Sequence, residues 1–216
     1  LAHLTCVNST REHIGLVLDD LRENEVENIL ALRGDLNPNV PPQTDYRYAC
    51  DLIREVERYG GFDIAAACYP EVHPEARDLE EDIQHLKEKV DAGATHLISQ
   101  LFFDNNDFYS FLYRVRQAGI TVPVEAGIMP VRGAKSVRRM AERNASRIPD
   151  RLNTLLNKWG DDIQSLRAAG ILYASEQIAD LVAHDVDGVH LYSMNHPATT
   201  RRIWRNAEPL FRGTQG

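Results

Sequence analysis

Polar and ionisable side chains follow several short apolar runs in this sequence of 216 residues, and these are the groups that could do chemistry. They occur at His3, in the Arg-Gly-Asp turn at 33–35, at 69–73, at Gln100 and at 192–196. In parallel α/β folds, functional groups collect just beyond the carboxyl ends of strands. Arginine can hold a phosphate, aspartate can accept hydrogen bonds, and glycine lets the backbone approach a ligand closely. The pattern therefore predicts a polar ligand site at strand ends.

Each of these groups also has a plainer interpretation. Arg33 could pair with a neighbouring carboxylate, and Asp35 could simply cap a loop. His3 and His73 lie near apolar stretches, where a single histidine is more often a hydrogen-bonded core residue than a ligand. The loop at 69–75 contains two prolines that make it rigid, which suits a cofactor wall without proving one. The residues alone leave these alternatives open and name no reaction.

Several kinds of site are disfavoured. The histidines show no HExxH spacing, and no GxGxxG, GxxxxGK[ST] or GxSxG motif occurs. Cys6, Cys50 and Cys68 lack CxxC spacing, and Cys6 and Cys68 lie in apolar runs, where a thiol is expected to be a small buried hydrophobe. A reduced, cytoplasmic setting is expected. The net charge of −8 argues against nucleic-acid or membrane-surface binding, and no run of eighteen apolar residues exists. We expect no metal site.

Short apolar runs alternate with longer amphipathic segments, which predicts a parallel sheet with right-handed crossovers in one domain over 1–216. The expected strands are 1–7, 28–32, 62–69, 95–103, 122–128 and 188–192. The expected helices are 10–24, 46–60, 76–93, 105–118, 133–144, 161–184 and 197–208, with an additional helical excursion in an insertion at 145–170. This makes six strand–helix units, whereas a closed barrel needs eight. The sheet is therefore either open, as in a doubly wound fold, or lacks two N-terminal units.

Seven strings then resemble the methylenetetrahydrofolate reductase family, in its order and with roughly its spacing. They are AHLTC at 2–6, ALRGD at 31–35, YPEVHPEA at 69–76, KVDAGA at 89–94, QLFFD at 100–104, GIMPV at 127–131 and LYSMN at 191–195. The resemblance implies a (β/α)8 TIM barrel whose strands 3 to 8 lie in this chain. It also implies a flavoprotein that uses FAD and NADH or NADPH to reduce 5,10-methylenetetrahydrofolate to 5-methyltetrahydrofolate, in one-carbon and methionine metabolism.

The resemblance further implies a set of site residues. Positions that match the family's FAD-contacting motifs are His3, Arg33, Gly34, Asp35, Tyr48, Ala67, Tyr69, His73, Ala76, Asp82, His85 and Lys89. Asp35 looks like the aspartate that favours a cationic form of the folate, and Gln100 like the amide that bonds folate or nicotinamide; both are expected to be catalytic. Substrate contacts are expected at Asp35, Gln100, Met140, Tyr192, Met194 and His196. Met140 stands where the family can have a stacking phenylalanine, and His196 where an arginine can reach the folate tail.

In the family, AHLTC belongs to the third strand, so the resemblance places a glutamate general acid and a threonine near the flavin before Leu1. We therefore expect two further units upstream, with folate and nicotinamide as small-molecule partners and a homo-oligomer as the assembly. Two alternatives remain open. One is an FAD-binding subunit of this family that takes electrons from another protein, and the other is a pterin-binding barrel without flavin.

Overall fold

The computed structural model describes residues 1–35, 39 and 45–212. In this part of the chain, six parallel strands form one sheet whose strand order follows the chain order. The strands are β1 (Ala2–Thr5), β2 (Asn28–Leu32), β3 (Asp63–Cys68), β4 (His96–Ser99), β5 (Val124–Ile128) and β6 (Gly188–Leu191). The predicted parallel α/β fold with six strand–helix units is confirmed.

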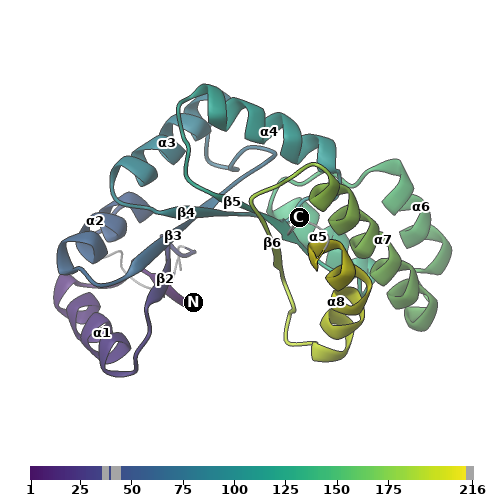
Figure 1. The fold of residues 1–216 in the computed structure, drawn as a ribbon, viewed down its shortest axis with the longest axis horizontal. Coiled ribbons are helices and arrows are strands. Elements are labelled where there is room, and N and C mark those ends of the chain that lie inside the picture. Colours follow the sequence, from purple (N-terminus) through teal and green to yellow (C-terminus); the bar gives the residue numbers. More distant parts are fainter. Residues whose placement is uncertain (36–38, 40–44, 213–216) are drawn as a thin grey trace.

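Helices follow the strands and cover one face of the sheet. They are α1 (Arg11–Glu23), α2 (Ala49–Tyr59), α3 (Leu79–Asp91), α4 (Asn105–Gln117), α5 (Ala134–Arg143), α6 (Asp150–Trp159), α7 (Ile163–Ala183) and α8 (Pro197–Arg212). The strands curve along the inside of an arch and the helices lie outside it (Figure 1). The helix expected within the 145–170 insertion is α6, which begins directly after Pro149.

The strands have two different faces because their side chains alternate. On the helix-covered face, Ile29 and Ile64 are fully buried in the main core. On the concave face, Leu30, Ala65 and Ile98 form a smaller apolar cluster. The strand register aligns Leu30 with Ala65 and with His3 on the neighbouring strands. The concave face therefore carries apolar residues in its middle and polar residues toward its ends.

The sheet is not closed within the described residues. β1 pairs only with β2, and β6 pairs only with β5, so these two strands are the edges. They face each other across the opening of the arch (Figure 1). The structure thus contains the curved wall of a barrel, built from six consecutive units.

Two predicted boundaries were wrong. β4 ends at Ser99 rather than at residue 103. Phe102 and Phe103 lie in the loop that follows β4, and because both are buried, the sequence of this loop resembles that of a strand. α8 continues past residue 208 to Arg212 and includes Pro209. Most other boundaries agree within three residues, and side-chain caps such as Asp78 and Asp162 mark the starts of α3 and α7.

The three cysteines are buried and free, as expected. Burial raises the pKa of the Cys6 thiol to about 11 and that of Cys68 to about 12, so both remain protonated at neutral pH. Among the described residues, no helix has the length and apolarity to cross a bilayer. The same residues contain no group of three or more metal-ligating side chains.

Candidate functional site

A cavity of about 280 Å³ lies between the start of α2, the middle and last turn of α3, and the loop that follows β3. Its wall combines positive, negative and aromatic side chains. The lining residues are Arg33, Tyr48, Ala49, Cys50, His73, Glu75, Ala76, Asp82, His85, Glu88 and Lys89. Seven of the twelve expected cofactor residues are among them: Arg33, Tyr48, His73, Ala76, Asp82, His85 and Lys89. The helical spacing of the last three does place them along one cavity wall.

Arg33 and Lys89 are the two cations in the lining of this cavity, and their surroundings differ. Both terminal nitrogens of Arg33 donate to the Glu75 carboxylate, at 2.6 and 2.7 Å, and the guanidinium lowers the pKa of that carboxyl. Lys89 instead donates to the carbonyl oxygen of Ala67 at 2.9 Å. Burial lowers the pKa of the Lys89 ammonium, and the nearby charge of Asp82 opposes this effect. Arg33 therefore pairs with a neighbouring carboxylate, which was the plainer of its two interpretations, and both residues of this pair line the cavity.

Asp82 and Tyr69 hold the rigid loop in place. The carboxylate of Asp82 accepts the backbone N–H of His73 at 2.9 Å, although Asp82 is itself buried. The ring of Tyr69 packs edge-on against the His73 imidazole, with 4.5 Å between ring centroids. Burial raises the pKa of the Tyr69 hydroxyl. Tyr69 therefore packs against the loop that Asp82 anchors.

Gln100 and Tyr192 lie at the carboxyl ends of their strands. The side-chain oxygen of Gln100 accepts the N–H of Leu101 at 3.0 Å, which fixes the amide orientation. The Tyr192 hydroxyl donates to the carbonyl oxygen of Ser99 at 2.8 Å. To do so, its ring passes over Gly127, where a Cβ atom would lie 2.9 Å from the ring. Gly127 thus leaves the space that this tyrosine occupies.

The other expected residues are more dispersed. His3 is exposed on β1, so the core-histidine alternative does not apply to it. Asp35 is also exposed and forms an ion pair with Arg143 of α5. Met194 lies in a turn with φ of 48°, half exposed, and His196 immediately precedes α8. Met140 packs against the apolar cluster beneath α5.

Gly34 packs closely against the chain that follows β1. Its φ of 86° favours glycine, and an added Cβ would lie 2.8 Å from the Val7 side chain and 3.1 Å from that of Thr5. The close approach is therefore to the chain after β1. This contact fixes where Arg33 and Asp35 leave the sheet.

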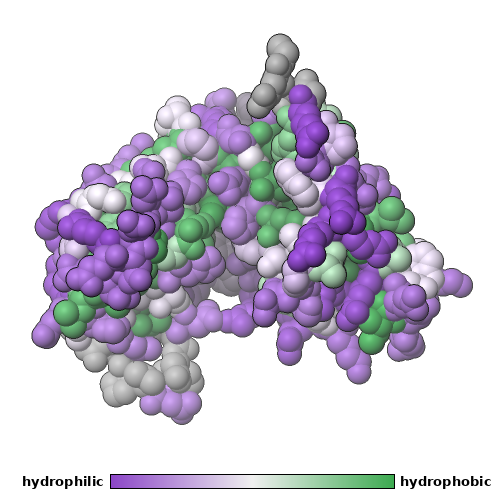
Figure 2. All heavy atoms as spheres, turned by 60° about the horizontal axis from the view of Figure 1, so that its bottom comes forward, coloured by the Kyte–Doolittle hydropathy of each residue, from purple (hydrophilic) through white to green (hydrophobic). Residues whose placement is uncertain are grey.

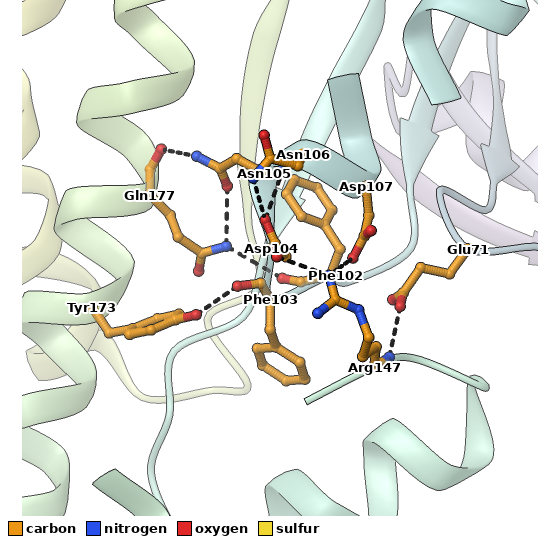
Figure 3. A network of polar contacts seen from close by, with 10 residues as sticks. All are labelled: Glu71, Phe102, Phe103, Asp104, Asn105, Asn106, Asp107, Arg147, Tyr173 and Gln177. Atoms are coloured by element: carbon orange, nitrogen blue, oxygen red, sulfur yellow. Dashed lines mark hydrogen bonds and ion pairs between the residues drawn. The ribbon is translucent and has the colours of Figure 1, made fainter. Parts of the chain in front are cut away.

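A second polar network fixes the loops next to this site (Figure 3). Arg147 donates from its guanidinium to Asp104 at 2.8 Å and to Asp107 at 3.0 Å, while its backbone N–H donates to Glu71 at 2.7 Å. From α7, the Tyr173 hydroxyl donates to the carbonyl oxygen of Phe103 at 2.6 Å. The network therefore ties the segment after α5 to the loops that follow β3 and β4.

Sequence reasoning missed several residues that shape the site. Glu75 lies inside the YPEVHPEA string, and its pairing with Arg33 could have been suspected from charge alone. Arg143 lies 108 positions from Asp35 in sequence, so no local pattern signals their contact. Arg147 is similar, because its partners belong to two distant loops.

Comparison with known proteins agrees with this architecture. The family model "Methylenetetrahydrofolate reductase" matches residues 1–208. The chain is 36% identical to 5,10-methylenetetrahydrofolate reductase of Escherichia coli over 194 residues, covering 89% of this chain and 64% of the relative. It is also 36% identical to methylenetetrahydrofolate reductase (NADH) 1 of Arabidopsis thaliana, covering 90% of this chain and 36% of that protein.

Solved structures show the same fold at much lower sequence identity. A Clostridium thermocellum protein that binds two copies of 5-methyl-5,6,7,8-tetrahydrofolic acid superposes with a TM-score of 0.63 at 9% identity, over 97% of this chain and 72% of the other. A deoxyribose phosphate aldolase from Aeropyrum pernix gives 0.50 at 13% identity, over 97% and 71%. These neighbours have TIM-barrel-like folds, which confirms the fold class. The chain spans less than two thirds of the length of the curated relatives named above, and across nearly all of its own length it belongs to the methylenetetrahydrofolate reductase family.

Proposed function

We propose that the protein containing this chain reduces 5,10-methylenetetrahydrofolate to 5-methyltetrahydrofolate, with FAD as bound cofactor and NADH or NADPH as electron donor. Family membership supports the reaction. The observation that carries the cofactor assignment is the single cavity lined by seven residues at the family's FAD positions. These residues come from α3, from the N-cap of α2 and from the loops after β2 and β3, so the fold brings together positions that are up to 56 residues apart in sequence.

The cavity suits the diphosphate of FAD. Lys89 is a buried cation that donates a hydrogen bond to the neutral carbonyl group of Ala67. A bound anion would offset the cost of burying this charge. Arg33 offers two parallel donors that are now held by Glu75 and match phosphate oxygens equally well. When bound, FAD would supply the hydride transfer from nicotinamide to folate. The protein side chains would bind, orient and stabilise charge.

Asp35 and Gln100 are proposed to act on the substrates. A carboxylate at Asp35 would favour positive charge on the pterin, because opposite charges attract. The amide oxygen of Gln100 accepts the N–H of Leu101, which keeps the group at the strand end. Such an amide can bond folate and nicotinamide in turn. Tyr192, Met194 and His196 would form the wall after β6, and Met140 the wall on α5.

A simple experiment tests this proposal. The purified full-length protein should be yellow and should oxidise NADH or NADPH with menadione or the folate as acceptor. A colourless protein that does not take up added FAD would contradict the cofactor assignment. A flavoprotein that reduces menadione but not the folate would contradict the substrate assignment. Cytoplasmic location and a homo-oligomeric state remain predictions.

The second candidate is an FAD-binding subunit that receives electrons from another protein. Met140 favours it, because this half-buried side chain packs in an apolar cluster and offers no aromatic face to a nicotinamide ring. Stopped-flow mixing of the isolated protein with NADH distinguishes the two. Rapid bleaching of the flavin absorbance would exclude the partner-dependent form, and bleaching only with an added reductase would support it.

A further inference from the structure

A carboxylate and an imidazole meet on the concave face of the sheet, outside the proposed FAD cavity. The Nδ1 atom of His190, on β6, lies 3.5 Å from a carboxylate oxygen of Glu125, on β5. Side chains alternate along each strand, and the neighbouring residues Ala126 and Val189 pack in the main core on the helix-covered face. Glu125 and His190 therefore point to the concave face, where their side chains are 35% and 27% exposed.

Two glycines leave room for this pair and for Tyr192. Gly188 stands opposite Glu125 in the strand register, and a Cβ atom there would lie 3.2 Å from the Cγ atom of Glu125. Gly127 stands opposite His190, and its missing side chain leaves the space that the Tyr192 ring occupies. The side chains of Glu125, His190 and Tyr192 therefore gather on one strip of the concave face.

His190 connects the carboxylate to the tyrosine. Its ring packs edge-on against the ring of Tyr192, with 4.9 Å between the centroids and 65° between the planes. The hydroxyl at the far end of the tyrosine donates to the carbonyl oxygen of Ser99. Among the described residues, the Glu125 carboxylate is the only polar partner of the His190 side chain. The position of the Tyr192 ring therefore depends on His190, and that of His190 on Glu125.

The pair acts on orientation more than on stability. Both groups are partly exposed to water, which screens their attraction, so the pair contributes little to the free energy of unfolding. The torsion that turns an imidazole about its bond to Cβ is broad, so packing alone does not fix the ring. A carboxylate beside Nδ1 selects one orientation and one tautomer of the imidazole. The ring of His190 thus presents a defined edge to Tyr192.

We propose that Glu125 and His190 are positioning residues for Tyr192. The carboxylate orients the imidazole, and the imidazole holds the tyrosine ring over Gly127 with its hydroxyl on Ser99. This inference rests on the proposed function, in which Tyr192 belongs to a wall that borders the folate. Glu125 and His190 do not themselves touch the substrate, so their effect on the reaction passes through the tyrosine.

Steady-state kinetics of the full-length protein test this route. In E125Q and in H190Q, the KM for 5,10-methylenetetrahydrofolate should rise about fivefold, with a smaller fall in kcat, because a displaced wall weakens substrate binding. The decisive variant is E125Q/Y192A. Once the tyrosine ring is removed, loss of the carboxylate should raise the KM by less than about twofold over that of Y192A. E23Q removes an exposed carboxylate from α1 and is the control for charge.

An E125Q substitution that raises the KM by the same factor with and without the Tyr192 ring would overturn the proposal, because the carboxylate would then act by another route. The same rise of the KM in E23Q would overturn it as well, because the loss of any carboxylate would then suffice.

Nitration of tyrosines by tetranitromethane gives a second readout that needs no substrate. Peptide mass spectrometry would follow Tyr192, with the exposed Tyr113 and the buried Tyr173 as references. In H190Q and E125Q, Tyr192 should be nitrated about threefold faster or more, because its ring is no longer held, while both references keep their wild-type rates. Burial, and to a lesser extent the Glu125 charge, raise the pKa of the Tyr192 hydroxyl, so E125Q alone would speed nitration. H190Q keeps that charge and separates position from charge.

The two readouts also separate this proposal from the proposed function. If the wild type does not reduce the folate but Tyr192 is nitrated faster in H190Q, the positioning pair stands and the proposed function fails. An unchanged rate at Tyr192 in H190Q would show that the pair does not hold the ring. Faster nitration of Tyr173 as well would show a general loosening of the fold. Either of these last two results would overturn the proposal.

Discussion

Arg143, in the last turn of α5, forms an ion pair with Asp35, which follows β2. The two residues come from opposite arms of the arch, since β2 lies near its left end and α5 near its right (Figure 1). In space-filling view, a hollow separates the two arms (Figure 2). Both side chains are largely exposed, so water screens the pair and it contributes little to stability. Its importance is that a cation lies beside the carboxylate proposed to stabilise a positive pterin.

Replacing Asp35 by Asn should leave FAD bound and slow the reduction of the folate by about tenfold or more, while flavin reduction changes much less. Only the folate step develops positive charge on the pterin. Stopped-flow absorbance measures the two half-reactions separately. R143Q is the control, because it breaks the same ion pair but keeps the carboxylate, and it should not slow the folate step. Equal slowing of both half-reactions in Asp35→Asn, or equal slowing by the two variants, would contradict this role.

Replacing Glu75 by Gln should strengthen FAD binding up to about fivefold, because the exposed carboxylate competes with the cofactor for Arg33. Arg33→Gln should weaken it. Fluorescence quenching during titration of the apoprotein with FAD gives both constants. Glu80→Gln removes the same charge from α3 outside the cavity and should have no effect. Weaker FAD binding in Glu75→Gln would show that this carboxylate supports the site instead.

Replacing Glu71 by Gln should make the protein more stable at pH 7 to 8 but not near pH 4. Burial raises the pKa of Glu71 above its ordinary value of 4.5, and one of its carboxylate oxygens is buried without a hydrogen-bond partner. A raised pKa means that the folded state binds the proton more tightly, so stability falls as pH rises through the folded pKa. Gln keeps an acceptor for the Arg147 N–H and carries no charge. Denaturant unfolding across this pH range measures the difference.

The exposed Glu23→Gln variant of α1 is the reference for this comparison. A stability difference between Glu71→Gln and wild type that does not change with pH would show that burial of the charge is not the cause.

Replacing Gly127 by Ala should destabilise the protein by about 1–3 kcal/mol, because the new methyl group would overlap the Ser99 carbonyl oxygen, 2.2 Å from the ideal Cβ position, and crowd Tyr192. Gly15→Ala is the matched control. It lies inside α1 with open space around it, and it should stabilise the helix by about 0.5–1 kcal/mol. Thermal unfolding of both variants tests the contrast. If Gly127→Ala were as stable as wild type, the tyrosine would not be held in this narrow space.

Local sequence patterns predicted the order and type of the secondary-structure elements because each strand is buried on its helix-covered face and each helix has one apolar side. The predicted end of β4 was wrong because Phe102 and Phe103 are buried although they lie in a loop. The helix end at residue 208 was also wrong, since α8 continues through Pro209.

Site residues that are close together in sequence could be predicted to lie together, whereas contacts between distant residues could not. Asp82, His85 and Lys89 share one helix, so their spacing alone indicated a common wall. Arg143 was not found, because its significance depends on which distant residue lies opposite it. Gly34 approaches Val7 closely in the structure, and its expected contact with the cofactor stays a prediction.

The strands have the same order in the sheet as in the chain, and this order has a consequence for how the fold assembles. Each of these strands can pair with the strand made just before it, so the sheet can grow along the chain while later strands are still being synthesised. The pairing of β6 with β5 differs in the length of chain that separates the two strands. Ala2 pairs with Ile29, whereas Glu125 pairs with Gly188 across more than twice as many residues, which adds about 0.6 kcal/mol of loop-closure entropy. We therefore expect β6 to dock last, and the hydrogen bond from Tyr192 to Ser99 to be a late event in folding.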